Sequence, residues 1–465
     1  MTSWVLVAVL AASQPAVEVV TLPNGMRWVL LARADQGRVS GLVMVDAGGR
    51  HEKEGETGSA HLLEHLAFAG TPIVGSVRGW RVEAPVQERD EALTDELGAL
   101  ITRGEGSGPR AQELITELVA VDRDWRELGD ARAFHQLLIR HEVTLNAWTT
   151  KDTTTYWGDF PREQLHLWLA AEAQRFAAPV FREFRTERDV VIQELRDRQG
   201  AATHGLEALW KLAFNEGYRW STAGREADLR GMSPRSLARF YARHYAPNHA
   251  VGVLVGEFDV SEAKRWLAET FAHVPARETA ALPVESFTQP AARRVPASEA
   301  WLLVGFPSPG LAAADAAQFE VTRELLDAGE GPFAELRLKS GGAVLGVSVS
   351  EGPGVVAPHL TMVLMRLRSS GEAGAAKQAL FDVLAKWVPS EDELVRAKVV
   401  LEKKRLVAQR TRRGLAEALA LQTLLEQQWE TVFQPRHAAV TGEQVVKVAR
   451  GFTAERAWLV ELVTP

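Results

Sequence analysis

The chain is predicted to repeat one order of strands and helices on either side of a segment rich in proline, alanine and charged residues, at 277–297. Residues 17–276 and 298–465 each open with strands, continue through helices and further strands, and return to long helices before a closing strand. Two units of similar element order indicate a duplication. The sequence therefore predicts an α+β fold of two homologous domains, each an antiparallel sheet with helices, joined by a linker.

Composition limits the classes of function. The 465 residues include 46% hydrophobic and 24% charged residues, which is ordinary for a globular protein with two or three buried cores. The net charge of -7 gives no indication of a nucleic-acid partner. The chain has no cysteine, which excludes disulfides, thiolate metal ligands and a cysteine nucleophile. No segment reaches membrane-spanning length, so no membrane span is expected.

The first residues have the pattern of an export signal. An apolar run from Trp4 to Ala12 is followed by small and polar residues, and it is too short to span a bilayer. We therefore expect residues 1–16 to be a signal peptide and the protein to be exported, either periplasmic or secreted. The run has no preceding Lys or Arg, so a buried first strand in a cytoplasmic protein stays open as the alternative.

Residues 73–139 interrupt the first domain. Two stretches of helical periodicity are joined there by the breaker "GEGSGP". This pattern predicts an inserted helical hairpin.

The motif "HLLEH" at 61–65 is a candidate metal-binding helix. Residues four apart lie on one face of a helix, so His61 and His65 can direct their imidazoles at one ion. Glu64 lies beside them, within reach of a water on that ion, and H-x-x-E-H is the inverted form of the zinc-peptidase motif. An ordinary amphipathic turn rich in histidine is the competing interpretation, because a catalytic zinc needs a third protein ligand.

Acidic residues on a later predicted helix could supply that ligand. Glu187 and Glu194 are seven residues apart, two helical turns, and therefore share one face. A charged, solvent-exposed face explains the same spacing, so the residues alone leave both interpretations open.

Three motifs together resemble a known family. "GETGSAHLLEHLAFAGT", "LNAWTTKDTTTYW" and "TERDVVIQELRDR", in this order, resemble the pitrilysin/insulinase family of inverted-motif zinc metallopeptidases, in particular its processing-peptidase-like two-domain subunits. The resemblance extends through nearly the whole chain. It implies one Zn²⁺ per chain, bound by His61, His65 and Glu194. It also implies Glu64 as the general base and a supporting role for Glu187 in catalysis.

The resemblance also implies where substrate binds. Asn146, Ala147 and Thr149 match the family's strand along which a peptide lies, although ordinary strand-edge hydrogen bonding is an equal interpretation of these residues. In the second unit, Arg337 matches an arginine that contacts substrate. The family's tyrosine, seven residues further on, is replaced by Val344, which cannot donate a hydrogen bond to an oxyanion.

These expectations lead to a zinc metalloendopeptidase acting on peptides or unfolded segments, with Glu64 as the general base. Because Val344 leaves no oxyanion donor, we predict the metal-bearing subunit of a heterodimer. A paralogous subunit without H-x-x-E-H would supply the Arg/Tyr pair. A homodimeric or monomeric enzyme with weakened oxyanion support is one alternative, and a non-catalytic interaction or assembly subunit is another.

Overall fold

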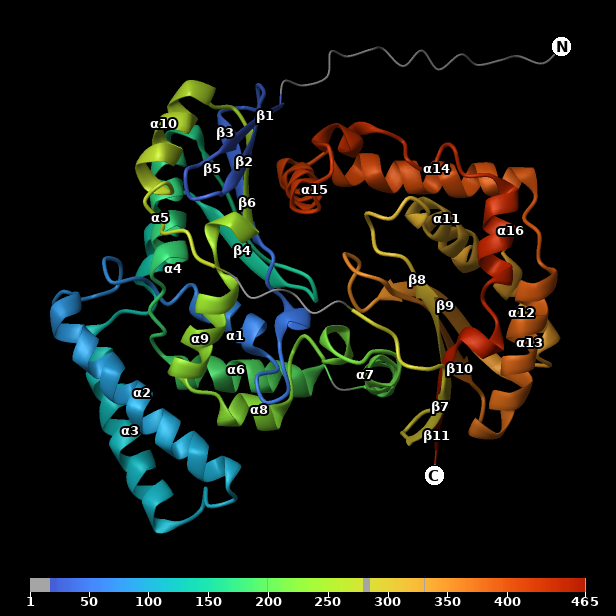
Figure 1. Cartoon of the computed structure of the whole chain (residues 1–465), viewed down its shortest axis with the longest axis horizontal. Helices are drawn as coiled ribbons and strands as arrows, with labels where there is room; N and C mark the ends of the chain where they lie inside the picture. The colour runs from blue at the N-terminus through green and yellow to red at the C-terminus, as the bar shows by residue number, and fades with distance from the viewer. Residues whose placement is uncertain (1–16, 199, 279–284, 330, 465) are drawn as a thin grey trace.

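The structure is a computed structural model that describes residues 17–198, 200–278, 285–329 and 331–464. The predicted signal peptide at 1–16 and residues 279–284 of the predicted linker lie outside the described residues. No helix in the described ranges combines the length and apolar character needed to cross a membrane. The fold is α+β, as predicted, with helices around two sheets (Figure 1).

The first sheet has six strands in the order β1-β2-β6-β3-β5-β4. The strands are β1 (Val17–Thr21), β2 (Arg27–Ala32), β3 (Arg38–Val45), β4 (Thr144–Thr149), β5 (Thr154–Pro161) and β6 (Ala250–Gly256). β1 and β2 are consecutive antiparallel strands and form an opening hairpin. β4 ends the sheet, so one of its two edges is free of strand pairing.

The second sheet repeats five of these strands in the order β7-β11-β8-β10-β9. The strands are β7 (Ala292–Pro296), β8 (Trp301–Ser308), β9 (Val344–Gly352), β10 (His359–Leu367) and β11 (Trp458–Val463). Taken in chain order, β7 to β11 occupy the same sheet positions as β2 to β6, which confirms the predicted duplication. β7 begins the second sheet inside the segment predicted to be the linker, 277–297.

The prediction of purely antiparallel sheets needs one correction. β2 pairs with β6 in parallel, and β7 pairs with β11 in parallel, whereas the other neighbours are antiparallel. The closing strand of each unit lies between two strands that run in opposite directions. It must therefore be parallel to one of them.

The helices cover both faces of the sheets. In the first unit they are α1 (Ser59–Leu66), α2 (Trp80–Thr102), α3 (Pro109–Leu128), α4 (Ala133–Arg140), α5 (Leu165–Ala177), α6 (Phe184–Asp197), α7 (Ala201–Ala213), α8 (Glu226–Gly231), α9 (Pro234–His244) and α10 (Val260–Thr270). In the second they are α11 (Ala316–Asp327), α12 (Pro332–Lys339), α13 (Ala373–Lys386), α14 (Glu391–Ala408), α15 (Arg412–Leu424) and α16 (Gly442–Arg450).

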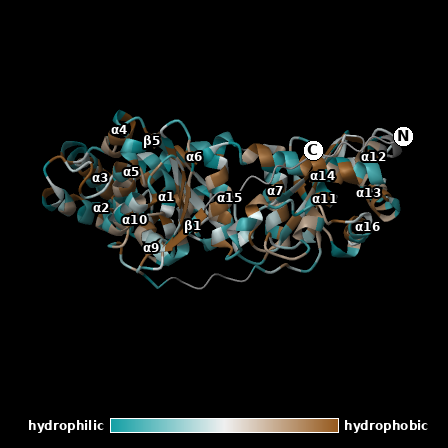
Figure 2. Cartoon of the chain, turned by 90° about the horizontal axis from the view of Figure 1, so that it is seen from above, coloured by the Kyte–Doolittle hydropathy of each residue, from teal (hydrophilic) through white to brown (hydrophobic). Residues whose placement is uncertain are grey.

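Two equivalent helices are exchanged between the units. α7 belongs to the first unit by sequence but packs on β8 and β11, where Leu209 joins a buried cluster with Leu303 and Leu462. α15 belongs to the second unit but packs on β3 and β6, where Leu419 contacts the core of the first sheet. Both helices lie in the middle of the elongated molecule (Figure 2). Each sheet therefore depends on the other unit to cover one of its apolar faces.

The inserted helical hairpin is present as α2 and α3, and buried ion pairs attach it to the first unit. Arg182, just before α6, pairs with Glu83 of α2 at 2.5 Å, and both side chains are almost completely buried. Arg185 at the start of α6 pairs with Asp90 of α2 and Asp122 of α3. The insertion is therefore fixed to the helix that carries Glu187 and Glu194.

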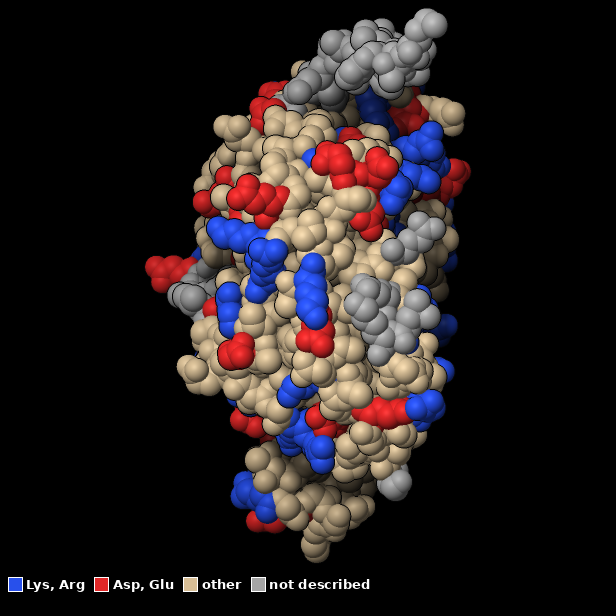
Figure 3. Space-filling view, turned by 90° about the vertical axis from the view of Figure 1, so that its right-hand side faces the viewer, with Lys and Arg blue, Asp and Glu red and all other residues tan. Residues whose placement is uncertain are grey.

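The surface at the far end of the second unit carries both signs of charge. Lys and Arg lie among Asp and Glu there, without one continuous basic patch (Figure 3).

Candidate metal centre and active site

α1 positions the H-x-x-E-H motif, and its N-terminus is satisfied by a buried carboxylate. Gly58 precedes the helix with φ of 93°, a left-handed conformation that favours glycine. The carboxylate of Glu52 accepts hydrogen bonds from the N–H groups of Gly58 and Ala60, both at 2.8 Å. These are donors that a helix start leaves without partners. Sequence reasoning missed Glu52, since no local motif pairs it with α1.

The predicted ligands converge from two helices. His61 Nε2 of α1 lies 3.6 Å from Glu194 Oε2 of α6, and His65 Nε2 lies 3.8 Å from Glu194 Oε1. The ligand atoms of the three residues all lie within 4.8 Å of one another, and among the described residues this is the only such group that could hold a metal. Two imidazoles and one carboxylate form a donor set suited to zinc.

Zinc bonds of about 2.0–2.1 Å in a tetrahedral site place ligand atoms about 3.3 Å apart. The two histidine–carboxylate separations are a few tenths of an ångström longer and end on different oxygens of Glu194, and the three ligand atoms lie within 4.8 Å of one another. Side-chain rotations would bring them to bonding distance of one ion. The residues present therefore fit the ion that the donor set favours.

Glu187 orients the second histidine. Its Oε2 lies 3.2 Å from His65 Nδ1. If Nδ1 carries the proton, the hydrogen bond to Glu187 leaves Nε2 with a free lone pair toward Glu194. Burial lowers the pKa of His65, but Glu187 and Glu194 outweigh that effect and raise the pKa above its ordinary value.

His61 is held neutral. Burial, together with positive charge on His65 and Arg198, lowers the pKa of His61 to about 4. A neutral imidazole offers the lone pair that a metal needs. Arg198, which the sequence did not single out, forms an ion pair with Glu194 at 3.1 Å.

Glu64 is fixed by a residue from the sheet. The hydroxyl of Thr149, at the end of β4, donates to Glu64 Oε2 at 2.6 Å. Burial raises the pKa of Glu64, and the hydrogen bond from Thr149 partly offsets that rise. Thr149 was expected to contact substrate, whereas here its hydroxyl contacts Glu64.

The other expected substrate residues divide into two groups. Asn146 and Ala147 lie on β4 at the free edge of the first sheet, next to Thr149. Arg337 is exposed on α12, which lies across the molecule from α1 (Figure 1). Val344 begins β9 and is buried in the core of the second unit. Within one chain, the structure does not bring Arg337 to the metal ligands.

Comparisons with known proteins show which family the chain resembles. The family described as "Insulinase (Peptidase family M16)" matches residues 28–76, and that described as "Peptidase M16 inactive domain" matches residues 231–401. These two matches confirm the resemblance to the M16 insulinase family that the motifs predicted.

Several curated proteins are similar in sequence. The probable zinc protease PqqL of Escherichia coli is 23% identical over 267 residues, which are 56% of this chain but only 23% of PqqL. The zinc protease PqqE of Helicobacter pylori is 22% identical over 72% of this chain and 68% of its own length. The β subunit of the mitochondrial processing peptidase of Caenorhabditis elegans is 47% identical over 58 residues, 12% of each chain.

Solved structures support the fold. A protease from Helicobacter pylori has a TM-score of 0.76 at 18% identity and covers 96% of this chain and 99% of its own. The periplasmic protease PqqL of Escherichia coli has a TM-score of 0.67 at 18% identity, covering 96% of this chain and 47% of PqqL. This chain thus spans about half of the longer PqqL protein.

Proposed function

We propose that this protein is a zinc-dependent endopeptidase that hydrolyses peptides or unfolded segments. The observation that carries the proposal is the convergence of two imidazole nitrogens and the Glu194 carboxylate, with Glu64 held beside them. His61, His65 and Glu194 would hold one zinc ion. Zinc bound there supplies a Lewis acid that polarises the substrate carbonyl and lowers the pKa of water.

The side chains of the chain itself have separate roles. Glu64 accepts the proton of the attacking water and passes it to the leaving amine. Thr149 holds the Glu64 carboxylate in place, and Glu187 fixes the tautomer and orientation of His65. A peptide pairs with the free edge of β4 through main-chain hydrogen bonds, next to Asn146 and Ala147.

The chain acts as the metal-bearing subunit of a two-subunit enzyme. Val344 is an apolar residue buried in the second core, so this chain offers no tyrosine there for an oxyanion. A partner that carries the Arg/Tyr pair would supply it. The mitochondrial processing peptidase β subunit is named as one subunit of its enzyme, which is compatible with this assignment. If the tests below fail to support this assignment, the chain is instead a homodimer or a non-catalytic assembly subunit.

The protein is exported in this proposal, with residues 1–16 as the signal peptide. The relative PqqL is described as a periplasmic protease. Mature protein from the native source should begin near Gln14 to Val17, which N-terminal sequencing can check. Protein that keeps Met1 would place it in the cytoplasm.

Zinc content and hydrolysis together test the function. Purified protein should contain one zinc per chain, and zinc removal by a chelator should abolish peptide cleavage. Glu194→Gln should lose zinc affinity and cleavage together. Asp189→Asn is the matched control, because Asp189 lies on the same helix but is exposed and pairs with Arg188. A chain that binds no zinc and cleaves nothing, even with its partner, would be an assembly subunit.

A further inference from the structure

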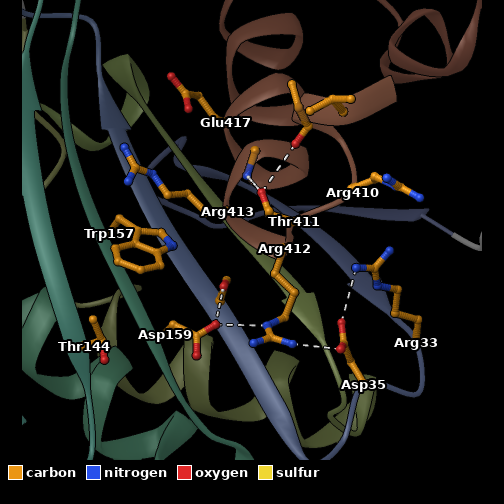
Figure 4. Close-up of a pocket in the computed structure, with 14 residues that line it drawn as sticks. Arg33, Asp35, Thr144, Trp157, Asp159, Arg410, Thr411, Arg412, Arg413 and Glu417 are labelled. Carbon is orange, nitrogen blue, oxygen red and sulfur yellow. Dashed lines mark hydrogen bonds and ion pairs between the residues drawn. The ribbon is translucent and has the colours of Figure 1, made fainter. Parts of the chain in front are cut away.

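A pocket of about 790 Å³ lies beside the free-edge strand β4, between the first sheet and the exchanged helix α15. The end of α14 and the start of α15 form one wall, and Trp157 and Asp159 of β5 form part of the other (Figure 4). Thr144 at the beginning of β4 also lines it. The exchange of α15 therefore places side chains of the second unit against the strand proposed to bind peptide.

The pocket is lined by four arginines, and two of them are neutralised within it. Arg33 pairs with Asp35 at 3.2 Å, and Arg412 pairs with both Asp35 and Asp159. Arg410 and Arg413 form no ion pair with any of the described residues. One carboxylate remains nearby, that of Glu417, one turn further along α15 from Arg413, without an ion-pair contact between them.

The Arg413 guanidinium stacks on two tryptophans. It lies 4.5 Å from the ring centre of Trp148 on β4 and 5.3 Å from that of Trp157 on β5. Figure 4 shows Arg413 extending from α15 toward Trp157. A guanidinium stacked on aromatic faces keeps the N–H donors at its edge free for a carboxylate. We call Arg413, Trp148 and Trp157 the Arg–Trp platform.

The platform lies on one face of β4. Side chains alternate along a strand, and Thr149 points toward Glu64 whereas Trp148 packs toward α15. Asn146 is directly opposite Trp157 in the sheet, so it shares the face of the platform. A peptide paired with β4 would likewise turn alternate side chains toward this face. A strand rises by about 3.3 Å per residue. The peptide side chains that face the platform therefore lie within about two residues of the peptide bond that is placed next to Glu64 for cleavage.

We propose that the Arg–Trp platform is a subsite for an acidic side chain of the bound peptide, two residues or fewer from the cleaved bond. The inference rests on the proposed binding of peptide at β4. Arg413 donates hydrogen bonds to the carboxylate, and the tryptophan faces exclude water from one side of the pair, which strengthens it. The substrates are therefore peptides with Asp or Glu close to the cleavage position.

Peptide binding and cleavage test the subsite separately. The probes are capped peptides of about ten residues, long enough to pair along β4, in which one Glu is moved through the positions and compared with Gln and Lys. Binding to the zinc-loaded full chain is measured by fluorescence anisotropy, and cleavage by mass spectrometry. The capped Glu peptide should bind about three- to tenfold more tightly than the Gln peptide at its best position, less so at high salt.

Substitutions assign the preference to Arg413. Arg413→Gln should remove the preference for Glu, and Arg413→Glu should favour the Lys peptide instead. Arg123→Glu on α3 is the control, since Arg123 is highly exposed and does not line the pocket. This substitution should leave the preference unchanged. An uncapped Gln peptide that binds as tightly as the capped Glu peptide would assign the subsite to a C-terminal carboxylate and overturn the proposal.

The remaining outcomes distinguish the two proposals. A Glu preference that is lost in Arg413→Gln supports the subsite; if in addition no peptide is cleaved, even after a paralogue with the Arg/Tyr pair is added, the result counts against the peptidase function. Cleavage that is equal for Glu, Gln and Lys peptides supports the function and overturns the subsite. Absence of measurable binding for every peptide overturns the subsite as well.

Discussion

The two units place the same pair of helices at the same point of the fold and use them differently. In the first unit α1 packs against α6 and brings two histidines to Glu194. In the second unit α11 packs against α14, and the residues between them are apolar. α1 and α11 both follow the second shared strand of their sheet, and α6 and α14 both follow the fourth.

The spacing is the same in both pairs. Val321 and Leu325 on α11 are four residues apart, like the two histidines. Leu394 and Leu401 on α14 are seven residues apart, like the two glutamates of α6. One helix-pair geometry therefore accommodates either a polar site or an apolar contact. The apolar version stabilises the fold, whereas the polar version gains its full value only when a cation binds.

The largest effect should come from the base in the first unit. Glu64→Gln is expected to lower kcat/KM by about 10²–10⁴-fold while zinc content stays at one per chain, because the amide cannot accept a proton. The matched residue in the second unit is Glu324, which directly precedes Leu325 and pairs with Lys404. Glu324→Gln should leave the rate unchanged. Equal losses of kcat/KM in both variants would show that Glu64 has no catalytic role that Glu324 lacks.

Stability should show the opposite asymmetry. Leu325→Ala is expected to reduce the free energy of unfolding by about 2–5 kcal/mol, because it leaves a cavity in the second unit. His61→Ala should change the stability of the zinc-free protein by less than about 1 kcal/mol, since His61 Nδ1 is buried without a hydrogen-bond partner in the described part of the chain. Urea unfolding measures both.

The same experiment with zinc reverses the order. Saturating zinc, at about 100 times its dissociation constant, should stabilise the wild type by about 2.7 kcal/mol. His61→Ala should lose this gain, and Leu325→Ala should keep it. Zinc stabilisation that survives in His61→Ala would remove His61 from the ligand set.

A partner subunit should complete what the second unit lacks. Adding a paralogue that carries the Arg/Tyr pair should raise the turnover of this chain by about 10²–10³-fold, equivalent to roughly 2.7–4 kcal/mol of transition-state stabilisation. Val344→Tyr in this chain should not substitute for the partner, because residue 344 is buried in the second core and a larger side chain would overpack it. Full turnover from the chain alone would show that no partner is needed.

The smallest effect should come from the residue that holds the base. Thr149→Val removes the hydroxyl that donates to Glu64 and is expected to lower kcat about tenfold, roughly 1.4 kcal/mol, with little change in KM. Thr149→Ser keeps the hydroxyl and should restore most of the rate. A change confined to KM would return Thr149 to a role in substrate binding.

Part of the site could be predicted because its signals are local. The four-residue spacing of the histidines and the seven-residue spacing of the glutamates follow from helical periodicity, and each helix was correctly expected. The inserted hairpin was visible for the same reason. The family motifs then connected Glu194 to the histidines, a link of more than a hundred residues that spacing alone cannot give.

Two of the contacts that were missed do not follow from the periodicity of a single helix or strand. Thr149 is 85 residues from Glu64, and its side-chain partner could not be inferred from a strand whose residues were expected to bind substrate. The cap of α1 by Glu52 depends on a loop path that no short motif specifies.

The sequence by itself determined the α+β duplication and the helical insertion, because these depend on residue periodicity. It also indicated the candidate ligands, through motifs that resemble those of a known family. The tertiary structure decided which side chains meet across the units. It placed α15 of the second unit on the first sheet, and with it Arg413 on Trp148, because an apolar sheet face must be covered by whichever helix can reach it. It also placed Arg337 far from the metal ligands, because α12 belongs to the second unit and lies across the molecule from α1.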